Sequence, residues 1–488
     1  MSAIGAIYPC NQNVILESDL MQLNQAMQHH GQDGSGIWFD HHCGLTQQQT
    51  NLTRESLYET LPYYHALHQI TLVTHCRLFN RKELCEQLAS FPVNDKTGDA
   101  QLIIFAYIQW GLAFIHYLVG EFSFILWDAK QEQLVCAVDH FNSRPLYYHV
   151  DEKYLVMASE ISALHRLPYI PRRPNLNKIA RNDLMRFQLE PGETCFEKIF
   201  FLPAAHFMVK NKSRLSLHKY WEPELGDCLS FDTDEAFSEA FQSMFKQAIN
   251  ASTRTHLPIC LQLSGGLDSS AIAMMASQCL KPQHRELICL SNVLPESYQG
   301  PLHDEREFIQ CVTAPNLITH AVIDSWRGPF DHLDSFTTHW QSSPQHYQYR
   351  ALNAAARSHH AKLMLHGTLG EMTCSYAGYE YLAQLFSRGQ FSTLHQEIMA
   401  HKKSYKRSYA GILAHNVGVP LLPSPFKSRL QSHHRRHLIQ SNLINPAFIQ
   451  QHFHAEQLKS IGDQVFQAQI LPSLDARPDH ASTHRYRG

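Results

Sequence analysis

The stretch Leu261-Gln262-Leu263-Ser264-Gly265-Gly266-Leu267-Asp268-Ser269-Ser270 decides the fold of the second half of this 488-residue chain. The apolar segment 257–263 predicts a buried strand. Gly265 and Gly266 then let the backbone turn tightly and let a ligand approach it, because neither residue has a Cβ atom. The segment 271–276, Ala-Ile-Ala-Met-Met-Ala, begins a helix. The stretch therefore predicts a strand, a tight turn and a helix.

The same turn predicts a phosphate-binding site, with an ordinary strand–turn–helix corner as the alternative. Free N–H groups at the start of a helix and the helix dipole both favour an anion. Asp268 would repel a phosphate unless a cation lies between them, and a magnesium-bound pyrophosphate meets that condition. The turn is not the GxxxxGK(S/T) phosphate loop, which needs a lysine here. The predicted ligands are ATP and Mg²⁺, and the predicted binding residues are Ser264, Gly265, Gly266, Asp268, Ser269 and Ser270.

Composition is that of an ordinary globular protein. Hydrophobic residues make up 44% and charged residues 17%, and a formal net charge of −3 provides no basic field for nucleic acid. No apolar run approaches the ~20 residues of a membrane span, and the N-terminus lacks a signal-peptide pattern. The twelve cysteines form no CxxC pair, which favours free thiols in a reducing compartment. We therefore expect a cytoplasmic protein that binds neither nucleic acid nor membrane.

Histidine is abundant, with 33 residues, and occurs in adjacent pairs. Neighbouring side chains on one helix or strand diverge, so such pairs are expected to be poor chelates. The HExxH spacing is absent, and the sequence predicts no histidine-based catalytic metal. The pairs are His29-His30, His41-His42, His359-His360 and His433-His434.

The first half of the chain carries strand signals. The polar residues 128–132 separate two strand segments and predict a hairpin. Residues 101–110 predict a helix that Gly111 ends. The strand segments are 72–74, 122–127, 134–138 and 154–158.

Several motifs of this half, in the same order, resemble the glutaminase domain of asparagine synthetases. They are Gly98-Asp99, Gly120–Phe124 (GEFSF), Asp139–Tyr148 (DHFNSRPLYY) and Ala158–Glu160 (ASE). The resemblance implies an α+β domain of the N-terminal-nucleophile type over residues 1–225, with two β-sheets between helices (αββα).

The resemblance further implies a degenerate class-II glutamine amidotransferase-like domain. The active family begins Met-Cys and uses the cysteine to attack glutamine, whereas this chain begins Met1-Ser2. Serine is a weaker nucleophile that needs an activating base. The family's Asn-Gly-Glu clamp falls on His75-Cys76-Arg77, which places a base where a carboxylate is required, and its Arg-Gly-Pro-Asp loop falls on His30–Asp33. We therefore expect no glutaminase activity, and we expect Cys10 and Cys76 to be ordinary apolar-pocket cysteines.

From about residue 235 the pattern alternates between strands and helices, which predicts an α/β domain with a parallel sheet and right-handed crossovers. An acidic linker at 224–234 separates the halves, and the second domain is predicted over 226–488. Ligands bind beyond the carboxyl ends of such strands, where the turn at 264–270 lies. The predicted strands are 258–263, 287–293, 317–323 and 362–366, after an amphipathic helix at 237–250.

The turn Ser264–Ser270 (SGGLDSS) resembles the pyrophosphate loop (PP-loop) of the asparagine synthetase-like ATP pyrophosphatases. These enzymes split ATP into AMP and pyrophosphate while they adenylate a carboxylate. The segment 363–371, with 376–379, resembles the family's SGxGGDE…GY segment. The resemblance implies that Gly367 lies against AMP and that Glu371 binds magnesium together with Asp268. Glutamate is one methylene longer than the family's aspartate, and Mg²⁺ demands tight octahedral geometry, so we expect a weakened site.

A charged segment, 303–308 (HDEREF), lies between these motifs. On its own it predicts a solvated helix start, because acidic residues are favoured near the positive end of the helix dipole. It also resembles the Asp-Glu-Arg/Ser segment of asparagine synthetase-like enzymes that process peptides. That resemblance makes Glu305 a candidate catalytic residue beside Asp268 and Glu371, and both interpretations remain open.

Within this family the chain resembles the lasso-peptide macrocyclases, whose amidotransferase-like domain lacks the N-terminal cysteine. The segments 77–84, 141–148, 304–308 and 378–383 carry the resemblance. It implies adenylation of an Asp or Glu side chain in a precursor peptide, attack by the peptide's N-terminal amine and release of AMP. Binding makes that attack intramolecular. The implied partners are the precursor peptide and a leader-peptide protease.

Two alternatives remain open. The chain is an asparagine synthetase-type enzyme that amidates aspartate or another small carboxylate with ammonia or glutamine, or it is a catalytically impaired ATP-binding relative. The impaired relative is favoured by Glu371 and by the missing counterpart of the family's Arg-x-Pro-(Phe/Tyr)-x-Asp motif and following lysine. The segment 476–488 is polar and poorly patterned, so we expect a second domain that is atypically short at its C-terminus.

Overall fold

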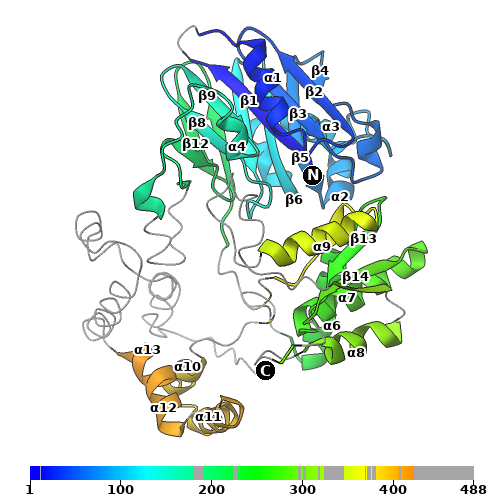
Figure 1. Cartoon of the computed structure of the whole chain (residues 1–488), viewed down its shortest axis with the longest axis vertical. Coiled ribbons are helices and arrows are strands. Elements are labelled where there is room, and N and C mark those ends of the chain that lie inside the picture. Colours follow the sequence, from blue (N-terminus) through cyan, green and yellow to red (C-terminus); the bar gives the residue numbers. More distant parts are fainter. Residues whose placement is uncertain are drawn as a thin grey trace. The chain divides into compact units, whose positions relative to one another are not determined.

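The computed structural model of the chain (Figure 1) describes residues 1–10, 13–179, 192–223, 229, 231–294, 298–299, 304–316, 319–323, 346–368, 370, 375, 381–405 and 408–422. The chain divides into two compact units. The larger unit consists of residues 1–178, 189–366 and 480–488, and the smaller of 179–188 and 367–479. All three sheets of the described residues belong to the larger unit.

The first half of the chain forms two antiparallel sheets of six strands each. The order in one sheet is β10 (Ile199–Phe201), β8 (Tyr147–Val150), β9 (Tyr154–Ala158), β1 (Ala3–Pro9), β3 (Gly44–Gln49) and β2 (Gly34–Phe39). The order in the other is β12 (Leu215–Lys219), β11 (His206–Lys210), β7 (Gln133–Val138), β6 (Gly120–Asp128), β5 (Ile70–Leu78) and β4 (Tyr63–His65). The predicted hairpin is confirmed, because β6 pairs with β7 and Asp128 lies opposite Gln133.

The two sheets pack face to face, and helices cover both outer faces. In β1, Ile4 and Ala6 join Trp127 of β6 in the core between the sheets, whereas Ala3 and Ile7 pack on the helical side. This is the period-two alternation of a strand that is buried on both faces. The covering elements are α1 (Glu17–Ala26) and α4 (Ile161–Leu164) on the first sheet, and α2 (Arg81–Gln87), α3 (Asp99–Trp110) and η2 (Gly111–Tyr117) on the second. A short turn, η1 (Glu55–Tyr58), precedes β4. The layer order is therefore helix, sheet, sheet, helix.

One helical stretch of the described residues, Asp99–Tyr117, is long and apolar enough to span a membrane by length and composition alone. It consists of α3, where the sequence predicts a helix, and η2. Leu102, Ile103 and Phe105 of this stretch are buried against the second sheet. A core helix passes the same test, so we assign the stretch to the core.

The second half begins with α6 (Asp234–Ser252) and continues into a four-stranded parallel sheet. The strand order is β15 (Thr319–Ile323), β14 (Leu287–Asn292), β13 (Ile259–Gln262) and β16 (Leu363–Leu365). Each strand lies within the range that the sequence predicts. The connecting helices are α7 (Leu267–Leu280), η3 (Lys281–Gln283), α8 (Arg306–Asn316) and α9 (His346–Ser358).

Helices cover both faces of this parallel sheet. Leu261 of β13 packs with Ala273 of α7 and Ile309 of α8, whereas Cys260 of β13 packs with Leu352 of α9. A strand that is buried on both faces accounts for the continuous apolar run that the sequence shows here.

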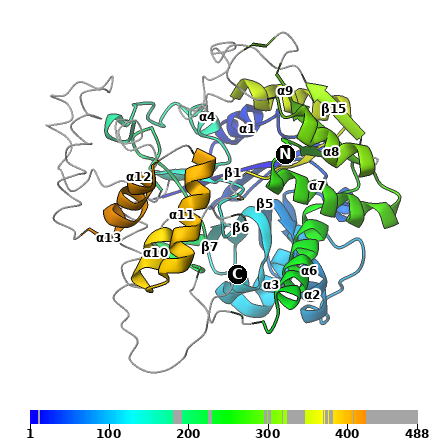
Figure 2. The same ribbon diagram turned by 90° about the horizontal axis from the view of Figure 1, so that it is seen from below.

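The smaller unit is helical in its described part. It contains α10 (Tyr381–Ser387), α11 (Phe391–Tyr405), α12 (Tyr409–Leu413), the π-helix η6 (Ala414–Gly418) and α13 (Val419–Leu421). Figure 2 shows α10 and α11 side by side, and Leu382 and Leu385 of α10 share a core with Leu394 and Ile398 of α11.

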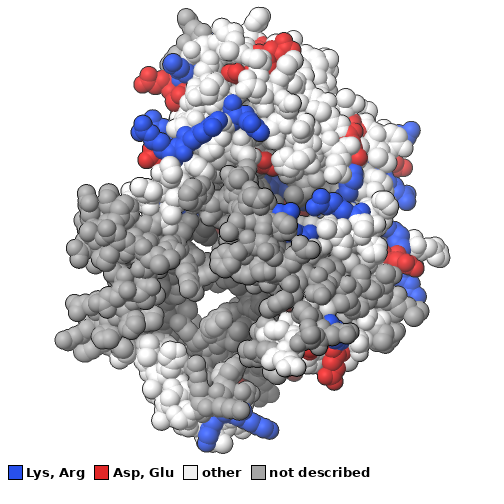
Figure 3. All heavy atoms as spheres, viewed as in Figure 1, with Lys and Arg blue, Asp and Glu red and all other residues white. Residues whose placement is uncertain are grey.

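Basic and acidic side chains occur close together at several places on the described surface that Figure 3 shows. This distribution agrees with the small net charge of −3. Steering of a polyanion requires a field of a single sign, and interspersed charges weaken such a field.

Candidate active site

The loop that follows β13 turns on a glycine that no other residue replaces easily. Gly265 has a φ of +81°, in the left-handed region. A Cβ atom on Gly265 would lie 2.9 Å from Cβ of Phe308 and 3.3 Å from the backbone nitrogen of Ile309. Both the conformation and the close approach of α8 therefore require glycine at this position.

The hydroxyl of Ser269 fixes the shape of the loop. Ser269 is 5% exposed, and its Oγ accepts a hydrogen bond from the backbone N–H of Ser264 (3.2 Å) and donates one to the carbonyl of Gly266 (3.1 Å). Ser264 Oγ lies 3.0 Å from Ser269 Oγ and completes the network. The hydroxyl of Ser269, a predicted nucleotide ligand, thus forms its hydrogen bonds within the loop in this structure.

The start of α7 offers unsatisfied donors. Gly266 is the N-cap residue and has no side chain to cap the helix. Ser270 donates its N–H to the carbonyl of Gly266 (3.0 Å), which leaves the preceding N–H groups of the first turn to an external acceptor. The Oγ atom of Ser270 is buried and has no hydrogen-bond partner among the described residues. These groups suit a phosphate oxygen.

Asp268 lies in the same first turn and is partly exposed. None of the ion pairs within the described part of the chain includes it. A carboxylate beside a phosphate-binding helix start needs a cation between the two anions. Asp268 therefore fits a divalent cation that bridges to a polyphosphate.

The structure brings Glu305 to this loop, although the two are far apart in the sequence. The carbonyl oxygen of Glu305 lies 3.4 Å from the position of a Cβ atom on Gly265. The side chain of Glu305 is exposed, and partial burial, followed by the charge of Asp304, raises its pKa. Arg306 pairs with Asp304 and donates to the carbonyl of Leu294 (2.7 Å), which ties the start of α8 to the segment after β14.

The second motif begins at the same edge of the sheet. β16 pairs with β13 in parallel, with Leu365 opposite Leu261, so their carboxyl ends share one edge. Gly367 and Thr368 follow β16, and the N–H of Gly370 donates to the carbonyl of Gly367 (3.4 Å). Glu371, the predicted second magnesium ligand, lies outside the described residues.

In the first half, Ser2 is the residue that the resemblance aligns with the family's cysteine. Ser2 is 9% exposed, and its Oγ accepts from the N–H of Thr50 (3.0 Å) and donates to the carbonyl of Thr50 (3.4 Å). Burial, followed by the charges of Arg144 and Lys362, lowers the pKa of the Met1 amine to about 6. The hydroxyl is thus committed to backbone groups.

Arg77, the basic residue at the predicted position of the family's carboxylate, is buried and paired. Its side chain is 4% exposed and donates to Glu121 Oε2 (3.3 Å) and to the carbonyl of Ser252 (2.8 Å). Arg144 pairs with the same carboxylate oxygen (2.7 Å). Burial, followed by the charge of Arg144, holds the pKa of His75 well below its usual range.

The cysteines of this half are poor nucleophiles. Burial raises the pKa of Cys10, and burial followed by the charge of Asp99 raises the pKa of Cys76 well above its ordinary value. A thiol with a raised pKa stays protonated at neutral pH and reacts slowly. This supports the expectation that neither cysteine replaces the missing nucleophile.

Polar contacts of two residues, Arg254 and Lys362, connect the parallel sheet to the first half of the chain. Arg254, which precedes β13, donates to Glu55 Oε2 (3.0 Å) and Asp99 Oδ2 (3.1 Å). Lys362, which precedes β16, donates to both carboxylate oxygens of Asp33 (2.9 and 2.7 Å). The sequence gives no local signal for either contact, because the partners belong to distant segments.

Two family models cover most of the chain. The model of the glutamine amidotransferase domain matches residues 1–221, and the asparagine synthase model matches residues 240–481. The chain belongs to the asparagine synthetase-like family. Asparagine synthase homologues are ATP-dependent carbon–nitrogen ligases.

Curated relatives of this asparagine synthetase-like protein are distant. Amidase chry2 of Gibberella zeae is 28% identical over 274 residues, which are 55% of this chain and 40% of that protein. Asparagine synthetase (glutamine-hydrolyzing) 3 of Bacillus subtilis is 26% identical over 259 residues, which are 52% of this chain and 42% of that protein. The chain thus matches about two fifths of the length of these relatives. The match to the solved glutamine phosphoribosylpyrophosphate amidotransferase of B. subtilis covers 75% of this chain and 91% of that chain, with 10% sequence identity. Its TM-score of 0.34 is too low to define a shared fold.

Proposed function

We propose that this protein is an ATP-dependent ligase that adenylates a carboxylate, releases pyrophosphate and closes a macrolactam ring in a precursor peptide of the lasso type. The observation that carries the proposal is the start of α7, where an uncapped helix, the unpartnered Ser270 Oγ and Asp268 lie together. A triphosphate with a divalent cation supplies the acceptors and the positive charge that these groups require.

In this proposal the loop and the second motif bind different parts of ATP. The turn Ser264–Ser270 holds the phosphates, and Gly367 leaves room for the nucleotide. Asp268 and Glu371 would hold Mg²⁺, which offsets the charge of the phosphates and of the leaving group. Glu305, beside the loop, accepts the proton that the attacking amine loses as the amide bond forms and AMP departs. Its raised pKa suits a general base.

The first half of the chain supports an amine that arrives with the substrate. Ammonia from glutamine requires a nucleophile in the amidotransferase-like pocket, and Ser2 Oγ is hydrogen-bonded to the backbone of Thr50. Cys10 and Cys76 have raised pKa values. The proposal therefore treats this domain as a support for the ligase domain, and a peptide with a free N-terminus supplies its own amine.

Asparagine synthetase-type amidation is the second candidate. It is favoured by relatives from B. subtilis and Methanocaldococcus jannaschii that are named asparagine synthetases (glutamine-hydrolyzing), the second of them a putative one. In that case the substrate is aspartate or another small carboxylate, and free ammonia supplies the nitrogen.

A pyrophosphate-release assay separates the candidates. The full chain is incubated with ATP and Mg²⁺ plus either aspartate and ammonia or a candidate precursor peptide, taken from a short reading frame beside a leader-cutting protease. Release of AMP with loss of one water mass from the peptide supports macrolactam closure, whereas asparagine formation supports the second candidate. Calorimetry that detects no binding of ATP in excess Mg²⁺ would falsify the ligase proposal as a whole.

A further inference from the structure

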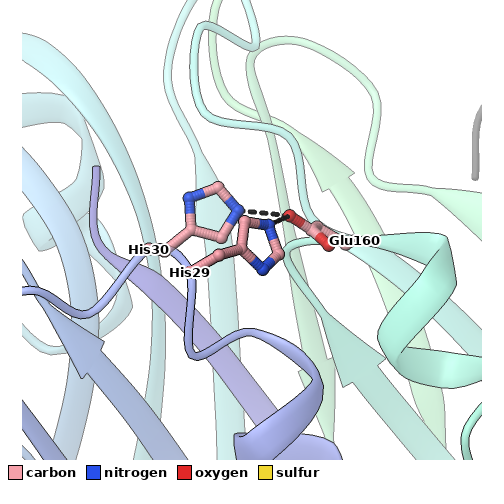
Figure 4. A group of neighbouring side chains, drawn as sticks. All are labelled: His29, His30 and Glu160. Atoms are coloured by element: carbon pink, nitrogen blue, oxygen red, sulfur yellow. Dashed lines mark hydrogen bonds and ion pairs between the residues drawn. The ribbon is translucent and has the colours of Figure 1, made fainter. Parts of the chain in front are cut away.

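Outside the proposed ligase site, three side chains of types that can bind metals lie together in the first half of the chain (Figure 4). Nε2 of His29 lies 2.8 Å from Oε1 of Glu160, and Nε2 of His30 contacts the same oxygen. One ligand atom of each residue lies within 4.8 Å of the other two. The His29 side chain is 59% exposed, whereas His30 and Glu160 are 19% and 13% exposed, so solvent reaches the group mainly at His29.

The local backbone explains why two adjacent histidines converge here. Both lie in the turn that follows α1, where the N–H of His30 donates to the carbonyl of Met27 (3.0 Å). Consecutive side chains diverge in a regular helix or strand, but this turn is neither. The two imidazole rings have centroids 4.2 Å apart, so the geometric reason for expecting adjacent histidines to chelate poorly does not apply to this pair.

Neighbouring hydrogen bonds fix the carboxylate of Glu160 and the backbone of His30. Ser162 Oγ donates to Oε2 of Glu160 (2.7 Å), which leaves Oε1 for the imidazoles. Thr50 Oγ1 donates to the carbonyl of His30 (2.5 Å) and anchors the turn. Metal ligands in proteins generally have supporting hydrogen bonds of this kind.

We propose that His29, His30 and Glu160 bind a divalent transition-metal ion, and that Zn²⁺ suits the site. Two imidazoles and one carboxylate, with water in the fourth position, form a ligand set that zinc uses. Mg²⁺ and Ca²⁺ prefer oxygen ligands and fit this set poorly. Tetrahedral zinc at about 2.0–2.2 Å from each ligand separates the ligand atoms by about 3.3 Å. The 2.8 Å contact between His29 and Glu160 must therefore open by only about half an ångström on metal binding.

The bound ion links two segments of the first half. Glu160 directly precedes α4, and Ser159 beside it accepts a hydrogen bond at Oγ from the N–H of Ile4 in β1 (2.9 Å). The turn with His29 and His30 continues to Asp33, the partner of Lys362. The ion would therefore stabilise the part of the first half that contacts Lys362, the residue before β16, and this inference is independent of the proposed function.

The experiment measures Zn²⁺ binding to the full chain by titration calorimetry and by metal content after dialysis. The variants are the double substitution His29→Ala/His30→Ala and the single substitution Glu160→Gln, which keeps an acceptor for Ser162. The matched control is His41→Ala/His42→Ala, another adjacent and exposed pair in the same domain. We expect the wild type and the control each to bind one more Zn²⁺ ion per chain than His29→Ala/His30→Ala binds. We expect the affinity of Glu160→Gln for Zn²⁺ to be at least about tenfold lower than that of the wild type.

Spectroscopy and unfolding complete the test. Co²⁺ in place of Zn²⁺ is expected to give the visible bands of four-coordination in the wild type and the control but not in His29→Ala/His30→Ala. Thermal unfolding in a chelator is expected to be the same for the wild type and Glu160→Gln, which separates lost binding from lost folding. Equal zinc stoichiometry in the two double variants, with Glu160→Gln at wild-type affinity, overturns the proposal.

Discussion

Replacement of Arg254 by alanine is expected to lower the free energy of unfolding, because Arg254 connects the parallel sheet to the first half of the chain. The guanidinium of Arg254 donates to Glu55, to Asp99 and to the carbonyl of Leu78, at 3.0, 3.1 and 3.0 Å. The side chain of Asp99 is 7% exposed and that of Arg254 is 24% exposed. The substitution therefore removes one donor from each of three acceptors: the buried carboxylate of Asp99, the carboxylate of Glu55 and the carbonyl of Leu78.

The magnitude follows from these contacts. Removal of one partner of a buried ion pair costs about 3–5 kcal/mol. Arg81 still pairs with Asp99 (2.8 Å) and Glu55 (3.4 Å), which partly compensates both carboxylates. We therefore expect the lower end of that range, a loss of about 3 kcal/mol in the free energy of unfolding. Arg254→Lys is expected to lose less, because it keeps the charge but has no planar fork to reach three acceptors.

Urea unfolding followed by tryptophan fluorescence measures the loss. Arg388→Ala is the matched control, because Arg388 is exposed and has no ion pair among the described residues, so it is expected to change the free energy by less than about 0.5 kcal/mol. A loss below about 1 kcal/mol for Arg254→Ala refutes the reasoning. It means that apolar packing, rather than the ion pairs, holds the two parts together.

Four further predictions concern single residues. Asp268→Ala is expected to abolish pyrophosphate release. The unfolding midpoint is expected to stay the same, because Asp268 is partly exposed and has no ion-pair partner in the described part of the chain. Retained pyrophosphate release contradicts a role of Asp268 in metal binding. Ser2→Ala is expected to leave the rate of amide formation unchanged, and a loss of activity restores the amidotransferase interpretation. Glu371→Asp is expected to raise the turnover number by shortening a magnesium ligand, and an unchanged rate argues that position 371 does not bind the metal. Burial, followed by the charge of Asp99, raises the pKa of Glu59 to about 8. The folded state therefore binds the proton of Glu59 more tightly than the unfolded state, whose carboxyl has a pKa near 4.5. The resulting stabilisation is fully present below about pH 4.5 and is lost as the pH rises to about 8. Glu59→Gln is expected to flatten the dependence of the unfolding midpoint on pH between these limits.

The regular elements could be predicted from the sequence because their signals are local. Residues 134–138 are strand formers beside a polar turn, and they form β7 paired with β6. The apolar run 257–263 contains β13, and the glycines and serines after it form the loop at the start of α7. Each of these predictions depends on residues that are neighbours in the chain, so no knowledge of the tertiary structure was needed.

The candidate site could be predicted only in part, because its other components meet through the tertiary fold. The charged segment at 304–308 gives no sign that Glu305 lies against Gly265, since the crossover of α8 decides this. The sequence predicts a basic Arg77 in the amidotransferase-like pocket, but it gives no sign that Glu121, from the neighbouring strand β6, pairs with this residue. Helix and strand geometry predicts that the side chains of His29 and His30 diverge, but the two residues lie in a turn.

The contacts at the amino ends of the central strands show what an amidotransferase-like domain with serine at position 2 contributes to the position of the second half. β13 and β16 are parallel neighbours whose carboxyl ends lead into the loop Ser264–Ser270 and the second motif. Arg254 precedes β13 and Lys362 precedes β16, and both residues bind carboxylates of the first half. A strand is nearly inextensible, so a contact that fixes its amino end also fixes the position of the loop at its carboxyl end. The geometry of the proposed ATP site therefore depends on the first domain even where that domain catalyses nothing, and substitutions at this junction affect the ligase through position rather than chemistry.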